Sequence, residues 1–268
     1  MTSSTVPPDG PLRLGSVQLP AGRQISAFES EPLLWATVDP VPDAGRAWFA
    51  LRRLRDQTGL IPILLAGLSK EEPGRPWDTD ELDEPIDPRD VDALDAATVL
   101  ATCWSDTLEA PDEASLDPEQ ARAIAPFCAR FPGLAPASRD RPVTAAEASE
   151  LLGLVGDVRI GMVPADRAAD VLAVIGFIGT ASRYGTPAEV TCVLRSWEER
   201  FGAVLLEVGF AGIRLLVQRP PRTRQAALAL AAEHFALCDE CGGLNAQTEV
   251  GDIADILLDA PVWTLAWD

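Results

Sequence analysis

Long apolar runs and a secretory leader are missing from this sequence of 268 residues. No uncharged apolar stretch approaches the roughly 20 residues that a helix needs to cross a bilayer, so we expect no membrane span. The opening residues, MTSSTVPPDGPLRLG, show no basic region followed by an apolar one, which predicts that there is no signal peptide. The five cysteines are odd in number and scattered. Together these features predict a cytoplasmic protein with reduced thiols.

Histidine and the common catalytic motifs are also scarce. His234 is the only histidine, so any imidazole chemistry must use it. The patterns G-x-G-x-x-G, G-x-x-x-x-G-K-[ST], H-E-x-x-H and G-x-S-x-G do not occur. Their absence argues against dinucleotide-binding and P-loop enzymes, and we expect no cofactor.

Basic residues are few: 22 Lys and Arg against 41 Asp and Glu give a net charge of −19. This balance disfavours binding to nucleic acid or to an anionic membrane surface. Residues 71–119 hold 17 acidic and two basic residues, which is −15 of the total. The segment is either a solvated surface or an acidic face for a basic protein partner. Trp77 and Asp78 within it are candidate binding residues, unless the indole packs back onto the fold.

Hydrophobic periodicity predicts an α+β protein. Strand patterns at 12–19, 32–38 and 61–66, with a helix at 43–58, indicate an N-terminal α/β unit with parallel strands. The later elements are expected as strands at 158–163, 204–208, 213–218 and 262–267 and helices at 166–175, 187–201, 223–238 and 252–258. Apart from extra helical pieces, this order is β-α-β-β-α-β, which is typical of a ferredoxin-like domain. The expected division is an α/β unit with helical extensions and an acidic loop at 1–131, a linker at 132–156 and a ferredoxin-like domain at 157–268.

Glu233 and His234 stand out as polar residues in an almost wholly apolar predicted helix. A buried carboxylate needs a partner, and Arg195 or Arg200 on the preceding helix could supply it. Trp197 lies on the apolar stripe of that preceding helix and is expected in the core; if exposed, it and Arg195 become candidate binding residues. The alternative is that Glu233, His234 and Arg200 are catalytic residues that line a pocket.

His234, Cys238 and Cys241 form the pattern H-x3-C-x2-C, which could supply three metal ligands. A structural zinc site uses four ligands, and nothing in the sequence fixes the fourth. We therefore expect no metal, and these three residues are the ligands to test if one is found.

Four pieces of the C-terminal part resemble a bacterial family known as domain of unknown function 4253. They are Ser-Trp-Glu-Glu-Arg-Phe-Gly-Ala at 196–203, Arg-Pro-Pro at 219–221, Ala-Glu-His-Phe-Ala-Leu-Cys at 232–238, and the terminal stretch from Trp263 to Asp268. The resemblance covers about residues 157–268, and the segments at 58–62 and 75–77 look like the leader region of longer members. It implies no activity. The family usually continues Cys-Pro-Asp where this chain has Cys238-Asp239-Glu240-Cys241.

Two functions remain open from the sequence. The first is an interaction or regulatory protein, such as an acidic inhibitor that covers a basic partner, because catalytic motifs are absent and negative charge is concentrated in one segment. The second is a small-molecule enzyme or ligand binder with Glu233, His234 and Arg200 in a pocket between the domains. A hydrated site at Glu233 and His234 would favour the second, and a dry, paired site the first.

Overall fold

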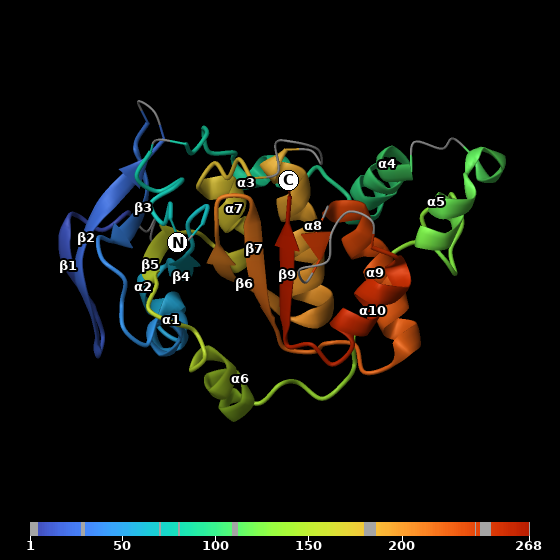
Figure 1. The fold of residues 1–268 in the computed structure, drawn as a ribbon. Helices are drawn as coiled ribbons and strands as arrows, with labels where there is room; N and C mark the ends of the chain where they lie inside the picture. Colours follow the sequence, from blue (N-terminus) through green and yellow to red (C-terminus); the bar gives the residue numbers. More distant parts are fainter. Residues whose placement is uncertain are drawn as a thin grey trace. The chain divides into compact units, whose positions relative to one another are not determined.

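The computed structural model describes residues 5–27, 30–69, 71–79, 81–108, 112–179, 186–238, 240–241 and 248–267 (Figure 1). The strands are β1 Gly10–Leu14, β2 Val17–Ser26, β3 Pro32–Thr37, β4 Leu60–Leu65, β5 Arg159–Pro164, β6 Ala203–Val208, β7 Gly212–Val217, β8 Glu240–Cys241 and β9 Val262–Ala266. The α-helices are α1 Ala44–Arg52, α2 Arg55–Thr58, α3 Pro88–Val91, α4 Ala96–Leu108, α5 Pro118–Ala123, α6 Ala145–Leu152, α7 Val171–Val174, α8 Pro187–Phe201, α9 Arg224–Leu237 and α10 Val250–Leu257. Helices and strands in a mixed sheet confirm the α+β class.

The chain forms two compact units that interleave along the sequence. The first unit comprises residues 1–88, 144–179 and 205–213, and the second comprises 89–143, 180–204 and 214–268. This division differs from the consecutive one expected at 1–131, 132–156 and 157–268. The physical reason is long-range strand pairing, because β5 pairs with two strands from the first third of the chain.

In the first unit, β5 lies between β3 and β4 and is antiparallel to both. Trp35 pairs with Met162 on one edge of β5, and Ile63 pairs with Gly161 on the other. The expected parallel strands β3 and β4 thus run in the same direction without being neighbours. In a ferredoxin-like domain the first strand would lie between the third and fourth strands of the motif, whereas here both edges of β5 are taken by β3 and β4. The predicted order of strands and helices along this part of the chain is found, but the ferredoxin-like arrangement of the strands in the sheet is wrong.

The helix expected at 43–58 is divided in the structure. It forms α1 and α2, and Gly59 ends the second piece with a φ of 66°. Helix α1 packs on β4 through Trp48, whose indole N–H donates to the Pro62 carbonyl oxygen at 2.8 Å. The prediction located the helical residues correctly and missed the break.

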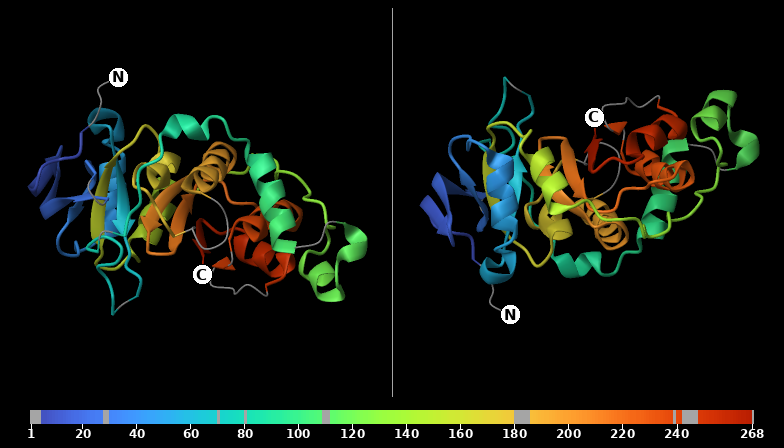
Figure 2. Two further views of the ribbon diagram at one scale, coloured as in Figure 1. Left: turned by 90° about the horizontal axis from the view of Figure 1, so that it is seen from above. Right: turned by 90° about the horizontal axis from the view of Figure 1, so that it is seen from below.

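The second unit contains α4, α8, α9 and α10 together with β8, β9 and β7 from Arg214 onward. Figures 1 and 2 show α10 beside α9, and the contacts of α9 with α10 and with α4 agree with this view. Helix α8 has the predicted bounds and ends at Gly202, whose φ of 64° suits a residue without a side chain. Alternate side chains of β9 are buried, so Trp263 and Leu265 lie in the core. Within the described residues, no helix is long and apolar enough to cross a bilayer.

A close backbone approach at Gly176 yields a test of the first unit. Gly176 has a φ of 60°, and a Cβ there would lie 1.9 Å from the Asp83 carbonyl oxygen. We expect Gly176→Ala to lower the free energy of unfolding by about 3 kcal/mol, because left-handed backbone strain adds to a backbone clash. Denaturant unfolding measures the change.

Gly133→Ala is the matched control for that substitution. Its φ is 94°, but a Cβ there would meet nothing within 4 Å. Gly133→Ala should lower the free energy of unfolding only through backbone strain, by about 1–2 kcal/mol. Equal losses for the two variants would show that the contact with Asp83 contributes nothing.

Candidate functional site

The candidate site centres on Glu233, which is fully buried in α9 at 0% exposure. Its Oε2 accepts hydrogen bonds from Arg200 Nη2 at 2.6 Å and from Trp197 Nε1 at 2.8 Å. Its Oε1 accepts from Arg200 Nη1 at 2.7 Å and from the backbone N–H of Ala135 at 2.7 Å. Each carboxylate oxygen thus has two donors, and the arginine binds the carboxylate in the bidentate geometry that suits a planar guanidinium.

Helix α8 supplies the partners because Trp197 and Arg200 lie three residues apart and so project from the same side of the helix. Arg200 is held further by its own helix: Nε donates to Ser196 Oγ at 3.0 Å, and the guanidinium lies 5.1 Å from the ring centroid of Phe201. The pairing predicted from the sequence is found with Arg200. Arg195, the other candidate, instead pairs with Asp92 at 2.6 Å.

His234 is also fully buried, and it lies among aromatic rings. It stacks on Trp197 with ring centroids 4.5 Å apart at 13°, and it meets Trp263 edge-on at 5.2 Å. Neither imidazole nitrogen has a hydrogen-bond partner among the described residues. Burial lowers the pKa of His234 to about 3, so the ring is neutral near neutral pH.

This arrangement suits packing better than catalysis. The Glu233 carboxylate has no open lone pair directed at a substrate, because four donors already surround it. A general acid or base works best when its pKa lies near the working pH, and that of His234 is far below it. The Glu233 carboxylate is thus buried and fully paired with donors.

The ligand set proposed for a metal is only partly described. Cys238 Sγ lies 3.2 Å from the His234 carbonyl oxygen, as expected of a thiol donating within α9. The side chain of Cys241 lies outside the described residues. Among the side chains that the structure describes, no group of three His, Cys, Asp or Glu is placed to hold a metal. The absence of metal remains a prediction.

Trp77 is not an exposed anchor, although its loop is acidic. It is 1% exposed, and its indole N–H donates to the Ala66 carbonyl oxygen at 2.7 Å. Asp78 is exposed, and its carboxylate accepts from Arg159 at 2.9 Å. Of the two alternatives for Trp77, the structure shows the one in which the indole packs back onto the fold.

The sequence analysis missed Ala135, which lies in the segment expected to be a linker. Its backbone N–H binds Glu233 and its carbonyl oxygen binds Arg200. A backbone contact leaves no residue-type signal, and Leu-Ala-Pro at 134–136 is typical of a loop. The only indirect signal is that a buried carboxylate needs more hydrogen-bond donors than one arginine supplies, so a further donor had to come from elsewhere in the chain.

Two shallow depressions are described, and neither is lined by Glu233, His234 or Arg200. One, of about 510 Å³, is lined by Ala97, Thr98, Ala101, Thr102, Ser105 and Asp106 of α4. The other, of about 450 Å³, is lined by Thr5, Val6, Gln24, Glu31, Pro32 and Pro164 in the first unit.

The buried ion pair predicts a large and non-additive effect of substitution. We expect Arg200→Met to lower the free energy of unfolding by about 3–5 kcal/mol, because Glu233 loses its cation while buried. The double variant Glu233→Gln/Arg200→Met should recover part of that loss. Asp92→Asn is the control, since it removes a partner from the more exposed pair with Arg195 and should cost under about 1 kcal/mol. Strictly additive losses would contradict a coupled pair.

The buried imidazole predicts a pH dependence of stability. The folded pKa of His234 is about 3 and the ordinary value is 6.5, so between these values the unfolded chain binds a proton that the folded chain does not. The free energy of unfolding should therefore fall as the pH drops below 6.5. The contribution of His234 to this fall should reach roughly 3 kcal/mol at pH 4. His234→Phe should lack this component. Parallel stability curves for the wild type and the variant between pH 4 and pH 7 would refute the assignment.

Comparison with known proteins gives a family-model match over part of the chain and nothing on activity. Comparison with curated proteins and with solved structures gave no match. The C-terminal residues that carry Trp197, Arg200, Glu233 and His234 do match a family model. Residues 159–268 match the family described as Domain of unknown function (DUF4253), which is the family that the motifs of this part resemble.

Proposed function

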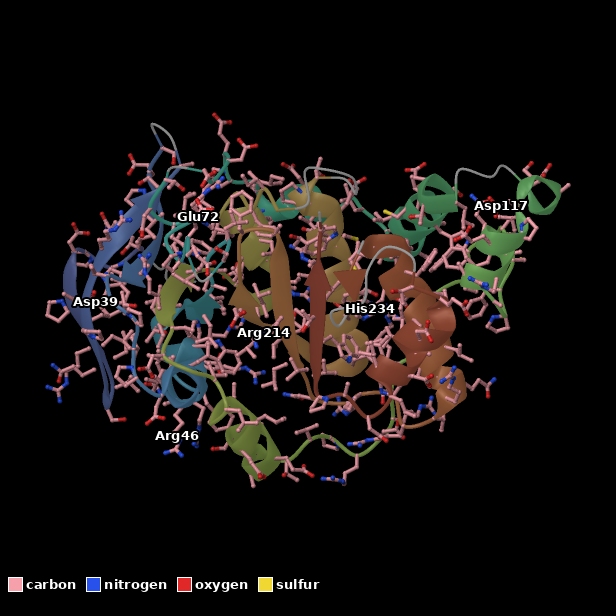
Figure 3. All side chains as sticks on the ribbon, viewed as in Figure 1. Asp39, Arg46, Glu72, Asp117, Arg214 and His234 are labelled. Carbon is pink, nitrogen blue, oxygen red and sulfur yellow. The ribbon has the colours of Figure 1, made fainter. Side chains whose placement is uncertain are left out.

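We propose that this protein is an interaction protein whose acidic segment binds a basic protein partner. The observation that carries the proposal is the part of the acidic segment that lies in the second unit and is described there, residues 90–108 and 112–119. Its exposed acidic residues are Asp90, Asp92, Asp95, Asp106, Asp112, Asp117 and Glu119. Asp117, at the start of α5, is labelled in Figure 3 well away from His234. A concentration of one sign of charge steers an oppositely charged partner to the surface and fixes its register.

Several of these carboxylates also accept hydrogen bonds from backbone N–H groups. Asp95 accepts from the backbone N–H of Thr98, Asp112 from that of Ser115 and Asp117 from that of Gln120. Such caps hold each carboxylate in place at the beginning of a helical turn. A partner would therefore meet these three carboxylates in fixed positions.

The outer face of α4 gives the acidic surface a shape. Its depression of about 510 Å³ is lined by small side chains, with Asp106 at one end. The opposite face of the helix is buried through Leu100 and Trp104, so the lining side chains are held on a fixed support. A basic side chain or short segment could lie along this face and reach Asp106.

The second function, an enzyme or ligand binder at Glu233 and His234, gains no support from the packing. Both residues are fully buried, and the acid is saturated with donors. The interaction proposal extends to a regulatory or inhibitory role, in which the acidic surface covers a basic face of its partner. We expect this role in the cytoplasm, where the cysteines would stay reduced.

The experiment compares two triple variants with the same change in net charge. Asp90→Asn/Asp106→Asn/Glu119→Gln removes three of the seven negative charges of the proposed surface without touching the capping residues. Binding of an oligo-arginine peptide at low salt should weaken about tenfold, from roughly 0.5 kcal/mol for each lost charge. Basic proteins captured from a lysate of the source cell should be lost in the same variant.

Asp39→Asn/Asp56→Asn/Asp157→Asn is the matched control, since these exposed residues lie in the first unit. It should bind the peptide and capture the same proteins as the wild type. If both triple variants weaken binding equally, attraction to the whole chain rather than to the surface at 90–119 explains it, and the proposal fails.

A further inference from the structure

Arg200 and Glu233 together bind both backbone hydrogen-bonding groups, the N–H and the C=O, of a single residue, Ala135. The N–H of Ala135 donates to Glu233 Oε1 at 2.7 Å, and its carbonyl oxygen accepts from Arg200 Nη1 at 2.7 Å. Recognition of both groups at one residue is how sheet edges and peptide-binding domains hold an extended segment. Because both bonds involve a charged group, each is stronger than a bond between neutral groups.

The binding groups are held in place by contacts that do not involve Ala135. Glu233 is fixed by Trp197, and Arg200 is fixed by Ser196 and by the ring of Phe201. All of these residues lie within 159–268, the part that matches the family model, whereas Ala135 lies outside it. The part that matches the family model therefore contains a preformed binding site. The preceding part of the chain supplies the segment that occupies it.

The bound segment continues past Ala135 with further backbone contacts. The N–H of Ser138 donates to the Arg200 carbonyl oxygen at 3.0 Å, and the N–H of Val143 donates to the Gln218 carbonyl oxygen at 2.6 Å. Residues 132–143 contain neither helix nor strand, as the ribbon between α5 and α6 shows (Figure 1). Recognition along the segment is thus mainly through the backbone.

Side-chain selection is concentrated at one position. Ala135 is 2% exposed, whereas Leu134 before it is 38% exposed. A buried methyl group next to the backbone contacts excludes larger side chains. Pro136 restricts Ala135 to an extended conformation, which presents its N–H and C=O to the receptor at little entropic cost.

We propose that Arg200 and Glu233, with the Arg200 and Gln218 carbonyl groups, form a peptide-binding site that is occupied in cis by residues 133–143. The ligand class is an extended peptide with a small residue followed by proline. In the intact chain the tethered segment has an effective concentration in the millimolar range or above, so it excludes a free peptide. A variant that weakens only the tethered segment should open the site.

The experiment measures binding of a fluorescent peptide with the sequence of residues 131–144 to the full chain. The wild type should show no binding. Ala135→Leu, whose side chain does not fit the buried position, should bind the peptide with a Kd in the micromolar to millimolar range. Ala135→Gly is the matched control: it keeps both backbone contacts and should behave like the wild type.

Modified peptides then test the contacts without any change in the receptor. N-methylation at the position of Ala135 removes the N–H that binds Glu233 and should weaken binding to the Ala135→Leu chain at least about tenfold. N-methylation at the position of Ala137, whose amide donates to none of the described residues, should leave the Kd unchanged. Equal effects of the two modifications would overturn the proposal.

Hydrogen exchange decides what a negative binding result means. If Ala135→Leu opens the amides of Ser138 and Val143 to exchange while the rest of the chain stays protected, the site is vacant and a failure to bind refutes the proposal. If Ala135→Leu unfolds, Ala135→Val replaces it, because it adds less bulk at the buried position. Loss of the acidic-surface function in the triple variant would leave this result untouched, because none of its positions contacts Ala135.

Discussion

The second unit depends on a charge that has been taken out of water. A carboxylate at 0% exposure costs several kcal/mol in lost hydration, and the structure repays this only through geometry. Glu233 accepts four hydrogen bonds, and these come from α8 and from the extended segment at Ala135. Helix α9 therefore cannot shift along α8 without breaking several bonds at once, and the position of the segment is fixed with them.

The aromatic packing follows from the same constraint. Trp197 donates to Glu233 through Nε1 and offers its ring face to His234. Trp263 then meets both Trp197 and His234 edge-on, which brings β9 against the two helices. One hydrogen bond thus sets the orientation of an indole, and that indole sets the packing of the rings around it. The low pKa of His234 follows from this enclosure and needs no catalytic explanation.

The sequence was sufficient where the signal is local or where burial forces a partner. The bounds of α8 follow from its apolar stripe and Gly202, and the pairing of Glu233 with Arg200 follows from a carboxylate in an apolar helix. The sheet could not be predicted in this way, because nothing near β5 records that its partners are β3 and β4. Trp77 shows a third case: the sequence left burial and exposure both open, and the contact that decides between them is with a backbone group, the Ala66 carbonyl oxygen, which accepts from the indole N–H.

The place of β5 between β3 and β4 also bears on how the chain is made. During synthesis β3 and β4 leave the ribosome long before residues 159–164, and neither can complete its pairing until β5 arrives. Every residue of β4 is buried in the finished protein. A nascent chain that has passed residue 65 but not residue 159 therefore carries an apolar strand with bare edges, which is a template for aggregation. Helix α1 can cover one face of that strand in the interval, but the strand edges stay unpaired, and shielding them is work for a chaperone.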